Sequence, residues 1–265
     1  MVKTIFLSGA TGFLGTHLSK QLLTNPDTRI IALLRAADHH SAEQRLKKEW
    51  WDWKELREAV GSRVQVFAGD ITQPDLGLNP ADYNYLVENT HFIIHTAADV
   101  RLFLPLDELR KVNVSGTHHM LALAYAIHKH HGLEHFGHVS TAYVAGKRSG
   151  LVEEKRLSTQ YGFSSPYEQS KFEAEELVWQ ASSDLPVSIF RPGMIVGDSQ
   201  HGAIKTFNTL YYPLRLYMTG KLWLAPARAS MHVNLVPVDY VAISIARLIG
   251  NPSAYGKAFH LTPPV

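Results

Sequence analysis

Tyr167 and Lys171 lie four residues apart, a spacing that places a phenol and an ammonium group on one face of a helix. A phenol has an unperturbed pKa of roughly 10, so it exchanges protons near neutral pH only when a neighbouring positive charge stabilises its anion. Lys171 can supply that charge, which makes the pair a candidate for general acid–base catalysis. The same spacing also occurs in helices without any catalytic function.

The residues around Tyr167 predict the start of a helix. Ser165 suits the N-cap, Pro166 suits the first helical position, and Glu168 stands where a capping box requires an acid. Tyr167 would then lie at the positive end of the helix dipole, where an anion is stabilised.

A glycine-rich turn near the N-terminus predicts a dinucleotide site. It has the sequence Gly9-Ala10-Thr11-Gly12-Phe13-Leu14-Gly15, between an apolar run and a helical pattern. The first glycine permits the tight turn, the second lets the backbone approach a pyrophosphate, and the third lets the helix pack on the strand. The helix N-terminus would present N–H groups to the anion. A purely structural turn from strand to helix is the alternative.

The cofactor preference depends on the residue about 20 positions beyond this turn, where an NAD site usually carries an acid. Arg35 stands there instead, and Arg45 lies on the following helical pattern. A guanidinium at this place would pair with a 2′-phosphate, so the two arginines predict NADP(H) rather than NAD. A solvated surface arginine is the alternative reading.

Apolar runs bounded by turn residues alternate with helical patterns along most of the chain. The runs are 4–7, 29–34, 63–67, 91–95, 136–140, 187–190 and 258–261, and the helical patterns are 13–23, 42–59, 106–131, 166–181 and 238–249. This alternation predicts an α/β fold with a doubly wound parallel sheet of about seven strands. Residues 198–240 break the alternation with an aromatic stretch, which predicts a small C-terminal substrate lobe inserted in a single domain, 1–265.

Composition narrows the function classes. The 265 residues are 45% hydrophobic, which is enough for a large core. A formal net charge of +2 permits phosphorylated ligands without indicating a nucleic-acid binder. The absence of cysteine excludes thiol catalysis and fits a reducing compartment. With no secretory signal and no apolar stretch of membrane-spanning length, we expect a cytoplasmic protein without stable membrane insertion.

Two further clusters, one of histidines and one of tryptophans, could have a function. His128 and His131 could share a helix face, but they lack a third close ligand and a carboxylate companion, so we expect no metal site. Trp50, Trp51 and Trp53 indicate either a contact with a partner or membrane surface, or packing of the indoles against the sheet.

The glycine turn together with Tyr167 and Lys171 resembles the extended branch of the short-chain dehydrogenase/reductases. The segment 95–98 is similar to the stretch over the cofactor ribose in that family, and Asp70-Ile71 is similar to the pair that contacts adenine. The segment 140–146 resembles the active-site strand end, which implies Thr141 as the catalytic hydroxyl, with Ser140 as runner-up. The segment 191–197 resembles the strand end that touches the nicotinamide.

The motifs and the resemblance together imply one set of site residues. The catalytic residues are Thr141, Tyr167 and Lys171. The cofactor-binding residues are Gly9, Thr11, Gly12, Phe13, Leu14, Gly15, Arg35, Arg45, Asp70, Ile71, Thr96, Ala97, Ala98, Asn113, Tyr167, Lys171, Pro192, Gly193 and Ile195.

Arg35 and the segment Gly197-Asp198-Ser199 resemble the corresponding residues of the thioester reductases and fatty acyl-CoA reductases. Members of that subgroup usually continue beyond the point where this sequence stops, so the resemblance implies a smaller member or a missing part of the substrate-binding region. It implies that hydride from NADPH reduces an acyl thioester, carried by CoA or an acyl carrier protein, to an aldehyde. Tyr167 would give the proton, Thr141 would hold the oxygen, and Lys171 would bond the nicotinamide ribose and lower the phenol pKa.

Two alternatives stay open. One is an extended dehydrogenase or epimerase acting on a sterol-like alcohol or a nucleotide sugar, and the other is a non-catalytic NADP-binding protein. The aromatic and aliphatic residues of 198–240 suit an acyl chain better than a sugar nucleotide. Lys205, Arg215, Lys221 and Arg228 could serve a phosphate or pantetheine.

Overall fold

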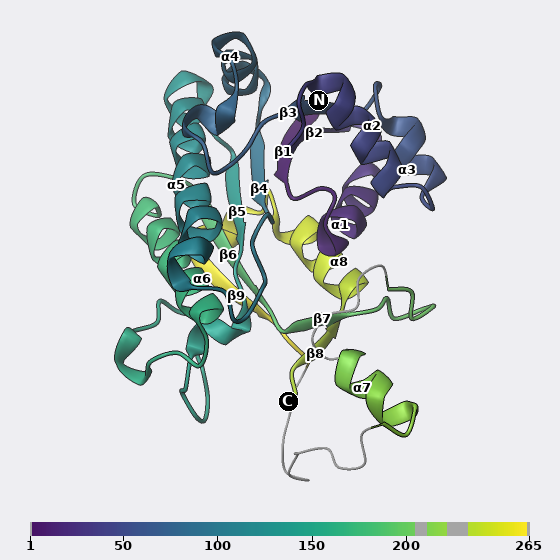
Figure 1. The fold of residues 1–265 in the computed structure, drawn as a ribbon. Helices are drawn as coiled ribbons and strands as arrows, with labels where there is room; N and C mark the ends of the chain where they lie inside the picture. Colours follow the sequence, from purple (N-terminus) through teal and green to yellow (C-terminus); the bar gives the residue numbers. More distant parts are fainter. Residues whose placement is uncertain (1, 205–210, 222–232, 264–265) are drawn as a thin grey trace.

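A seven-stranded parallel sheet forms the centre of the computed structural model, which describes residues 2–204, 211–221 and 233–263 (Figure 1). The strand order is β3-β2-β1-β4-β5-β6-β9. The strands are β1 (Lys3–Ser8), β2 (Thr28–Leu34), β3 (Val64–Ala68), β4 (Phe92–His95), β5 (His135–Val139), β6 (Val187–Pro192) and β9 (Lys257–Leu261). The order reverses between β1 and β4, and ligands of such sheets bind where this reversal opens a crevice at the carboxyl ends.

Helices cover both faces of the sheet, so the predicted doubly wound α/β fold is confirmed (Figure 1). One face carries α1 (Phe13–Leu23), α2 (His39–Glu49), α3 (Lys54–Ala59) and α8 (Val238–Leu248). The other carries α4 (Pro80–Asn89), α5 (Leu106–His131) and α6 (Pro166–Ala181). Each layer has its own apolar core against the sheet, and the strands are buried on both sides as a covered parallel sheet requires.

The single helix predicted for 42–59 is wrong, because the chain forms α2 and α3 with a break at Trp50 to Trp53. The Trp50 indole is fully buried against the sheet and its Nε1 donates to the Ala10 carbonyl at 3.3 Å. Asp38 begins α2 earlier than expected, since its carboxylate accepts from Ser41 N at 2.7 Å. Trp50 therefore packs against the sheet, whereas Trp51 is 69% exposed.

The remaining elements are short. β7 (Met194–Val196) pairs in parallel with β8 (Leu235–Pro237), and α7 (Tyr211–Met218) is near them (Figure 1). Short 3-10 helices are η1 (Pro74–Gly77), η2 (Ala142–Ala145), η3 (Thr159–Tyr161) and η4 (Pro252–Ala254). Parts of the expected substrate lobe, with Lys205 and Arg228, lie outside the described residues. Within the residues that are described, no helix has the length and apolarity needed to cross a membrane.

Candidate active site

A cleft of about 520 Å³ opens at the carboxyl ends of β1 to β4, where the strand order reverses. Its lining includes Gly9, Thr11, Gly12, Arg35, Arg45, Asp70, Ile71, Thr96, Ala97 and Ala98. Phe13, Leu14 and Gly15, which are also predicted to bind the cofactor, form the first turn of α1. Ten of the residues expected from sequence to bind the cofactor thus lie around one cavity.

The glycine turn leaves no room for side chains. Gly9 has a φ of 80°, in the left-handed region, and a Cβ there would lie 2.5 Å from Thr96 Oγ1. A Cβ on Gly15 would lie 2.1 Å from the Gly9 carbonyl oxygen, so α1 can begin this close to β1 only with glycine. This close approach, with the α1 N–H groups facing the cleft, fits the pyrophosphate of a dinucleotide.

Arginines line the adenosine end of the cleft. Arg45 Nη1 donates to the Arg35 backbone carbonyl at 2.7 Å, which fixes the two residues relative to each other. Sequence reasoning missed Arg101, which also lines the cleft and forms an ion pair with Asp99 at 2.5 Å. No motif marks Arg101, because only the folded loop after β4 brings it to the cleft.

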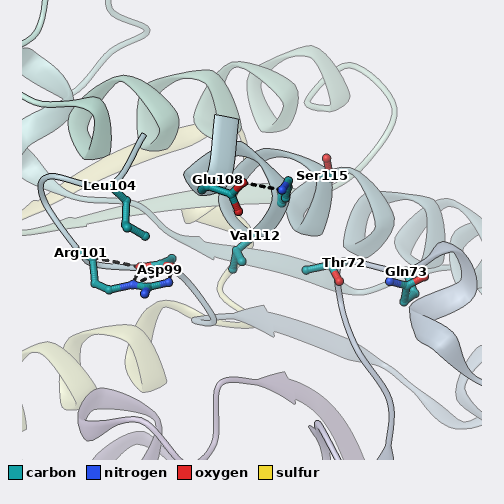
Figure 2. A pocket seen from close by; sticks show the side chains of 9 residues that line it. Thr72, Gln73, Asp99, Arg101, Leu104, Glu108, Val112 and Ser115 are labelled. Atoms are coloured by element: carbon teal, nitrogen blue, oxygen red, sulfur yellow. Dashed lines mark hydrogen bonds and ion pairs between the residues drawn. The ribbon is translucent and has the colours of Figure 1, made fainter. Parts of the chain in front are cut away.

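A second, shallower pocket of about 430 Å³ adjoins the cleft (Figure 2). It shares Thr72, Asp99, Arg101 and Val112 with the cleft and extends along the start of α5 to Glu108. Asn113, predicted to bind the cofactor, is a buried residue of α5 between α6 and the loop that follows β4. Its amide donates to the Asp99 carbonyl at 3.0 Å and to Ser170 Oγ at 2.9 Å, so it joins the cleft to the helix that carries Tyr167.

Tyr167, Thr141 and Lys171 come together at the carboxyl end of β5. The Thr141 side chain lies close enough to the Tyr167 phenol to lower its pKa, and Lys171 Nζ donates to the Val139 carbonyl at 2.8 Å. The Ser165 hydroxyl caps α6 by accepting from Glu168 N at 3.3 Å. The Glu168 carboxylate accepts from Ser164 N at 2.7 Å, one residue before the amide that a capping box would use.

The electrostatics differ from expectation. Burial raises the pKa of Tyr167 to about 12, although the nearby Thr141 side chain lowers it in part. Burial lowers the pKa of Lys171 to about 8, while the nearby Glu175 carboxylate raises it. The expected net lowering of the phenol pKa is therefore wrong, because desolvation of the buried phenol outweighs the groups that favour its anion. The phenol is held as a protonated group.

Ser140 faces away from this pair. Its hydroxyl is buried and donates to Glu175 Oε2 at 2.7 Å. Thr141, in contrast, points toward Tyr167, and its Oγ1 lies 3.5 Å from the Pro192 carbonyl. The geometry thus favours Thr141 over Ser140 as the hydroxyl that would contact a substrate oxygen.

The turn between β6 and β7 borders the same place. Gly193 has no space for a side chain, since a Cβ would lie 2.6 Å from the Asn234 carbonyl oxygen. Met194 N donates to that oxygen at 2.7 Å, and Ile195 pairs with Val236 of β8. The Pro192 carbonyl lies 3.5 Å from Thr141 Oγ1, so this turn is next to Thr141, and its contact with the nicotinamide stays a prediction.

The histidines do not form a metal centre in the part of the chain that the structure describes. His128 is exposed at the end of α5, whereas His131 Nε2 lies 3.0 Å from the Val87 carbonyl oxygen. The carboxyl ends of the strands carry the cleft and, outside its lining, the cluster of Tyr167, Thr141 and Lys171, and Asn113 connects the two.

This fold and this site define an NAD(P)-binding oxidoreductase of the extended short-chain dehydrogenase/reductase type. The chain belongs to the male sterility protein family, whose model matches residues 7–245.

Comparisons with curated proteins narrow this class. The chain is 31% identical over 280 residues to the nonribosomal peptide synthetase asaC of Aspergillus flavus, covering 98% of this chain and 26% of that protein. It is 32% identical over 279 residues to the L-2-aminoadipate reductase large subunit of Penicillium chrysogenum, covering 98% of this chain and 19% of that protein. The chain thus spans about a quarter or less of the length of these relatives.

Solved structures give the same picture. The terminal R domain from the myxalamid PKS-NRPS biosynthetic pathway superposes with a TM-score of 0.88 and 32% identity, covering 100% of this chain and 66% of that one. A thiolation-reductase di-domain from an archaeal non-ribosomal peptide synthetase gives 0.80 and 28%, covering 99% and 71%. The UDP-glucuronic acid 4-epimerase of Bacillus cereus, at 22% identity and a TM-score of 0.72, shares the fold alone.

Proposed function

We propose that this chain reduces an acyl thioester to an aldehyde with NADPH. The observation that carries the proposal is the cluster of Thr141, Tyr167 and Lys171 at the carboxyl end of β5, whose helix α6 is joined through Asn113 to the loop that lines the cleft. The relatives support the thioester as substrate, because they include a reductase domain joined to a thiolation domain and reductases named for aminoadipate. We infer a substrate tethered to a carrier protein or to CoA.

The glycine turn fits the cofactor because the backbone leaves no space for a Cβ at Gly9 or at Gly15. Bound NADPH supplies a hydride to the thioester carbonyl carbon. Tyr167 donates its proton to the carbonyl oxygen as negative charge develops there, and the Thr141 hydroxyl donates a hydrogen bond that holds that oxygen. The Lys171 ammonium stabilises the phenolate that Tyr167 becomes.

The second half of the reaction uses the same residues. The first product is a hemithioacetal, in which the former carbonyl carbon carries a hydroxyl and the thioether sulfur. Tyr167, now a phenolate, takes the hydroxyl proton back, the C–O double bond re-forms, and the C–S bond breaks to release a thiolate. Tyr167 thereby regains its proton, and the released thiolate takes a proton from water. The net result is one aldehyde and one thiol for each NADPH and each solvent proton consumed.

We infer NADPH rather than NADH from the arginines of the cleft. Arg35 and Arg45 both line it, and a 2′-phosphate would find two guanidinium groups there. The same place in an NAD site would usually present a carboxylate to the ribose hydroxyl.

The test is a coupled assay. The protein is incubated with NADPH and a panel of acyl-CoA thioesters, and with one acyl group loaded on a carrier protein, while NADPH absorbance and free thiol are recorded together. We expect one thiol released per NADPH oxidised. NADPH oxidation by a ketone without thiol release would instead identify an alcohol dehydrogenase, and cofactor binding without turnover of any substrate would favour a non-catalytic protein.

A further inference from the structure

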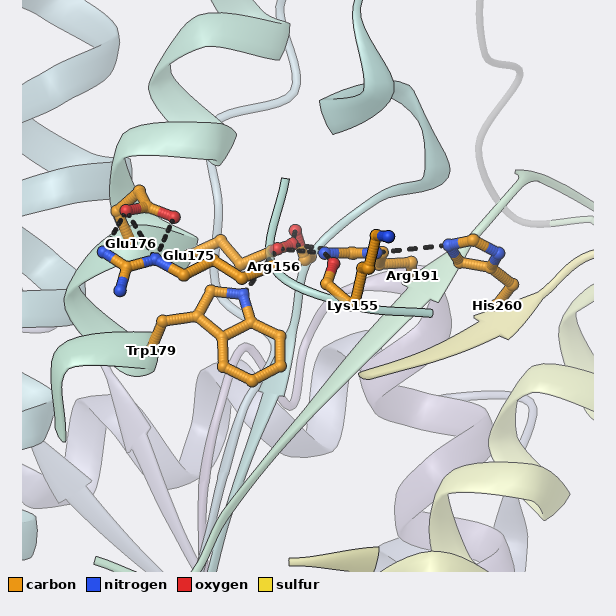
Figure 3. Close-up of polar contacts among 8 residues, drawn as sticks. Lys155, Arg156, Glu175, Glu176, Trp179, Arg191 and His260 are labelled. Atoms are coloured by element: carbon orange, nitrogen blue, oxygen red, sulfur yellow. Dashed lines mark hydrogen bonds and ion pairs between the residues drawn. The ribbon is translucent and has the colours of Figure 1, made fainter. Parts of the chain in front are cut away.

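A buried ion pair lies directly next to the proposed site and has no part in the chemistry derived above (Figure 3). The side chains of Arg191, on β6, and Glu175, on α6, are 0% and 2% exposed. Arg191 donates from Nη2 to Glu175 Oε1 at 2.5 Å and from Nε to Oε2 at 3.1 Å. The contact is therefore bidentate, the strongest arrangement for these two groups.

Further hydrogen bonds tie this pair to the surrounding elements. Glu175 also accepts from Trp179 Nε1 at 3.1 Å and from Ser140 Oγ at 2.7 Å. Arg191 also donates to the Lys155 carbonyl at 2.8 Å and contacts His260 Nε2 at 3.2 Å (Figure 3). The pair thus connects α6 with the carboxyl ends of β5, β6 and β9.

Glu175 and Lys171 hold adjacent residues of the same strand end. They lie one helical turn apart on α6. Lys171 Nζ donates to the Val139 carbonyl, and Glu175 accepts from the hydroxyl of the next residue, Ser140. Thr141 follows immediately, so the hydroxyl that faces Tyr167 is attached to a strand end fixed by both side chains.

Stability alone does not explain a buried ion pair at this place. Removing two charges from water is costly, and apolar residues of similar size often stabilise a fold as well or better. The charged neighbours point to another role. Lys171 is buried with His138 of β5 and His95 of β4, and its charge lowers the pKa of both histidines. The Glu175 carboxylate is the group that raises the pKa of Lys171 against the effect of burial.

We propose that Glu175 is the positioning residue for Lys171: held by Arg191, its carboxylate fixes α6 against the end of β5 and keeps the buried ammonium charged. This inference rests on the proposed function, since a charged Lys171 is what stabilises the Tyr167 phenolate. Glu175 itself touches neither the cleft nor the proposed reacting atoms.

The test measures the ionisation of Lys171 directly and needs no turnover. Protein labelled with ¹⁵N at the lysine side chains is titrated by NMR, and the Lys171 signal is identified by its loss in Lys171→Met. We expect a midpoint near the value of about 8 in the unmodified protein. In Glu175→Gln the midpoint should fall by about one pH unit, since an adjacent buried charge is worth about that much or more.

Glu176→Gln is the matched control. Glu176 is the next residue of α6 and forms an ion pair with Arg156 at the surface, where the two side chains are 23% and 53% exposed (Figure 3). Its replacement removes the same charge and also breaks an arginine pair, yet the Lys171 midpoint should stay within a few tenths of a pH unit because water screens this pair. Equal midpoints in Glu175→Gln and the unmodified protein, or equal shifts in both variants, would overturn the proposal.

A double variant guards against misfolding of Glu175→Gln, which leaves the Arg191 charge buried without a partner. Glu175→Gln combined with Arg191→Gln removes both charges, and its Lys171 midpoint should also fall, because the attraction of the carboxylate is gone. An unchanged midpoint in the folded double variant would reject the role of Glu175. In an active preparation, the alkaline limb of the kcat profile should move with these midpoints. Failure of thioester reduction would leave the NMR result intact, so the two proposals fail separately.

Discussion

Tyr167 is built to hold a proton rather than to rest as an anion. Burial raises its pKa to about 12, and the nearby Thr141 side chain offsets only part of this rise. The neighbouring Lys171 has a pKa lowered to about 8, so most of it stays charged at neutral pH. A protonated phenol beside a buried ammonium suits a reduction, in which the site must give a proton to a newly formed alkoxide.

Replacement of Tyr167 by Phe should therefore remove most turnover and leave cofactor binding nearly intact. General acid catalysis contributes about 10²–10⁴-fold, so we expect kcat to fall by that range while the Kd for NADPH changes little. Steady-state kinetics and fluorescence titration with NADPH measure the two effects. Tyr125→Phe is the control, because it removes an exposed phenol hydroxyl that contacts Asp184. Turnover retained in Tyr167→Phe would refute the role of this residue.

Arg35 is expected to set the cofactor preference. Arg35→Ala should reduce kcat/KM for NADPH by about 10–100-fold, the value of a charged hydrogen bond, and should affect NADH little. The ratio of kcat/KM for the two cofactors is the measurement. Arg29→Ala, which removes an exposed arginine from the same strand, should leave the ratio unchanged. An unmodified enzyme that prefers NADH would contradict this account of Arg35.

The sequence predicts those site residues that belong to a motif within one short segment of the chain. The glycine turn and the Tyr167 and Lys171 pair are visible because their partners lie within one turn or one helix. Arg101 and Glu175 carry no such signal. Each reaches the site through contacts between segments far apart in the chain, which only the fold creates.

Among the elements, α6 has the closest connection with the proposed chemistry. Its first turn carries Tyr167, its next turn holds Lys171 against β5, and its N-cap hydroxyl comes from Ser165. Loss of the cap should loosen the turn that places the phenol.

Ser165→Ala should lower the free energy of unfolding by about 1 kcal/mol and also lower kcat several-fold. Asp38→Ala is the matched control, since Asp38 caps α2 in the same way but away from Tyr167. It should cost a similar free energy and leave kcat unchanged. Urea denaturation and steady-state kinetics give both quantities, and an equal loss of kcat in the two variants would show that the cap acts through stability alone.

The break between α2 and α3 shows where element prediction fails. Charged residues with a helical period run through 42–59, so the local pattern indicates one helix. The burial of Trp50 and its bond to the Ala10 carbonyl decide otherwise, because this tertiary contact outweighs local propensity.

Over the whole molecule, the order of strands and helices was predictable since covered parallel strands are short apolar runs separated by helical patterns. All seven predicted runs overlap strands of the sheet. The order of the strands beyond β4, which is β5, β6 and then β9, was not predictable from local patterns. β9 comes from the C-terminal end of the chain and pairs with β6 across a long connection.

The buried histidines should make the whole fold sensitive to acid. Burial lowers the pKa of His95 to about 3 and that of His135 to about 4, and it lowers that of His138 well below its ordinary value. The unfolded chain therefore binds more protons than the folded protein below about pH 6.5, and stability falls as the pH falls from there.

Urea denaturation at several pH values measures this dependence. Each such histidine contributes up to about 1.4 kcal/mol per pH unit between about pH 6.5 and its folded value. His135→Gln should reduce the slope, whereas His118→Gln, which replaces an exposed histidine of α5, should not. Equal slopes in the two variants would show that the acid sensitivity has another origin.

In the proposed reaction, hydride from the nicotinamide reaches the carbonyl carbon of a thioester. The most direct test uses NADPH with deuterium in place of both hydrogens at the reactive carbon of the nicotinamide ring, together with an acyl-CoA. Mass spectrometry then identifies the isotope in the products. We predict an aldehyde with one deuterium on its carbonyl carbon and an equal amount of free thiol. An aldehyde without deuterium, or thiol released without aldehyde, would contradict the claim.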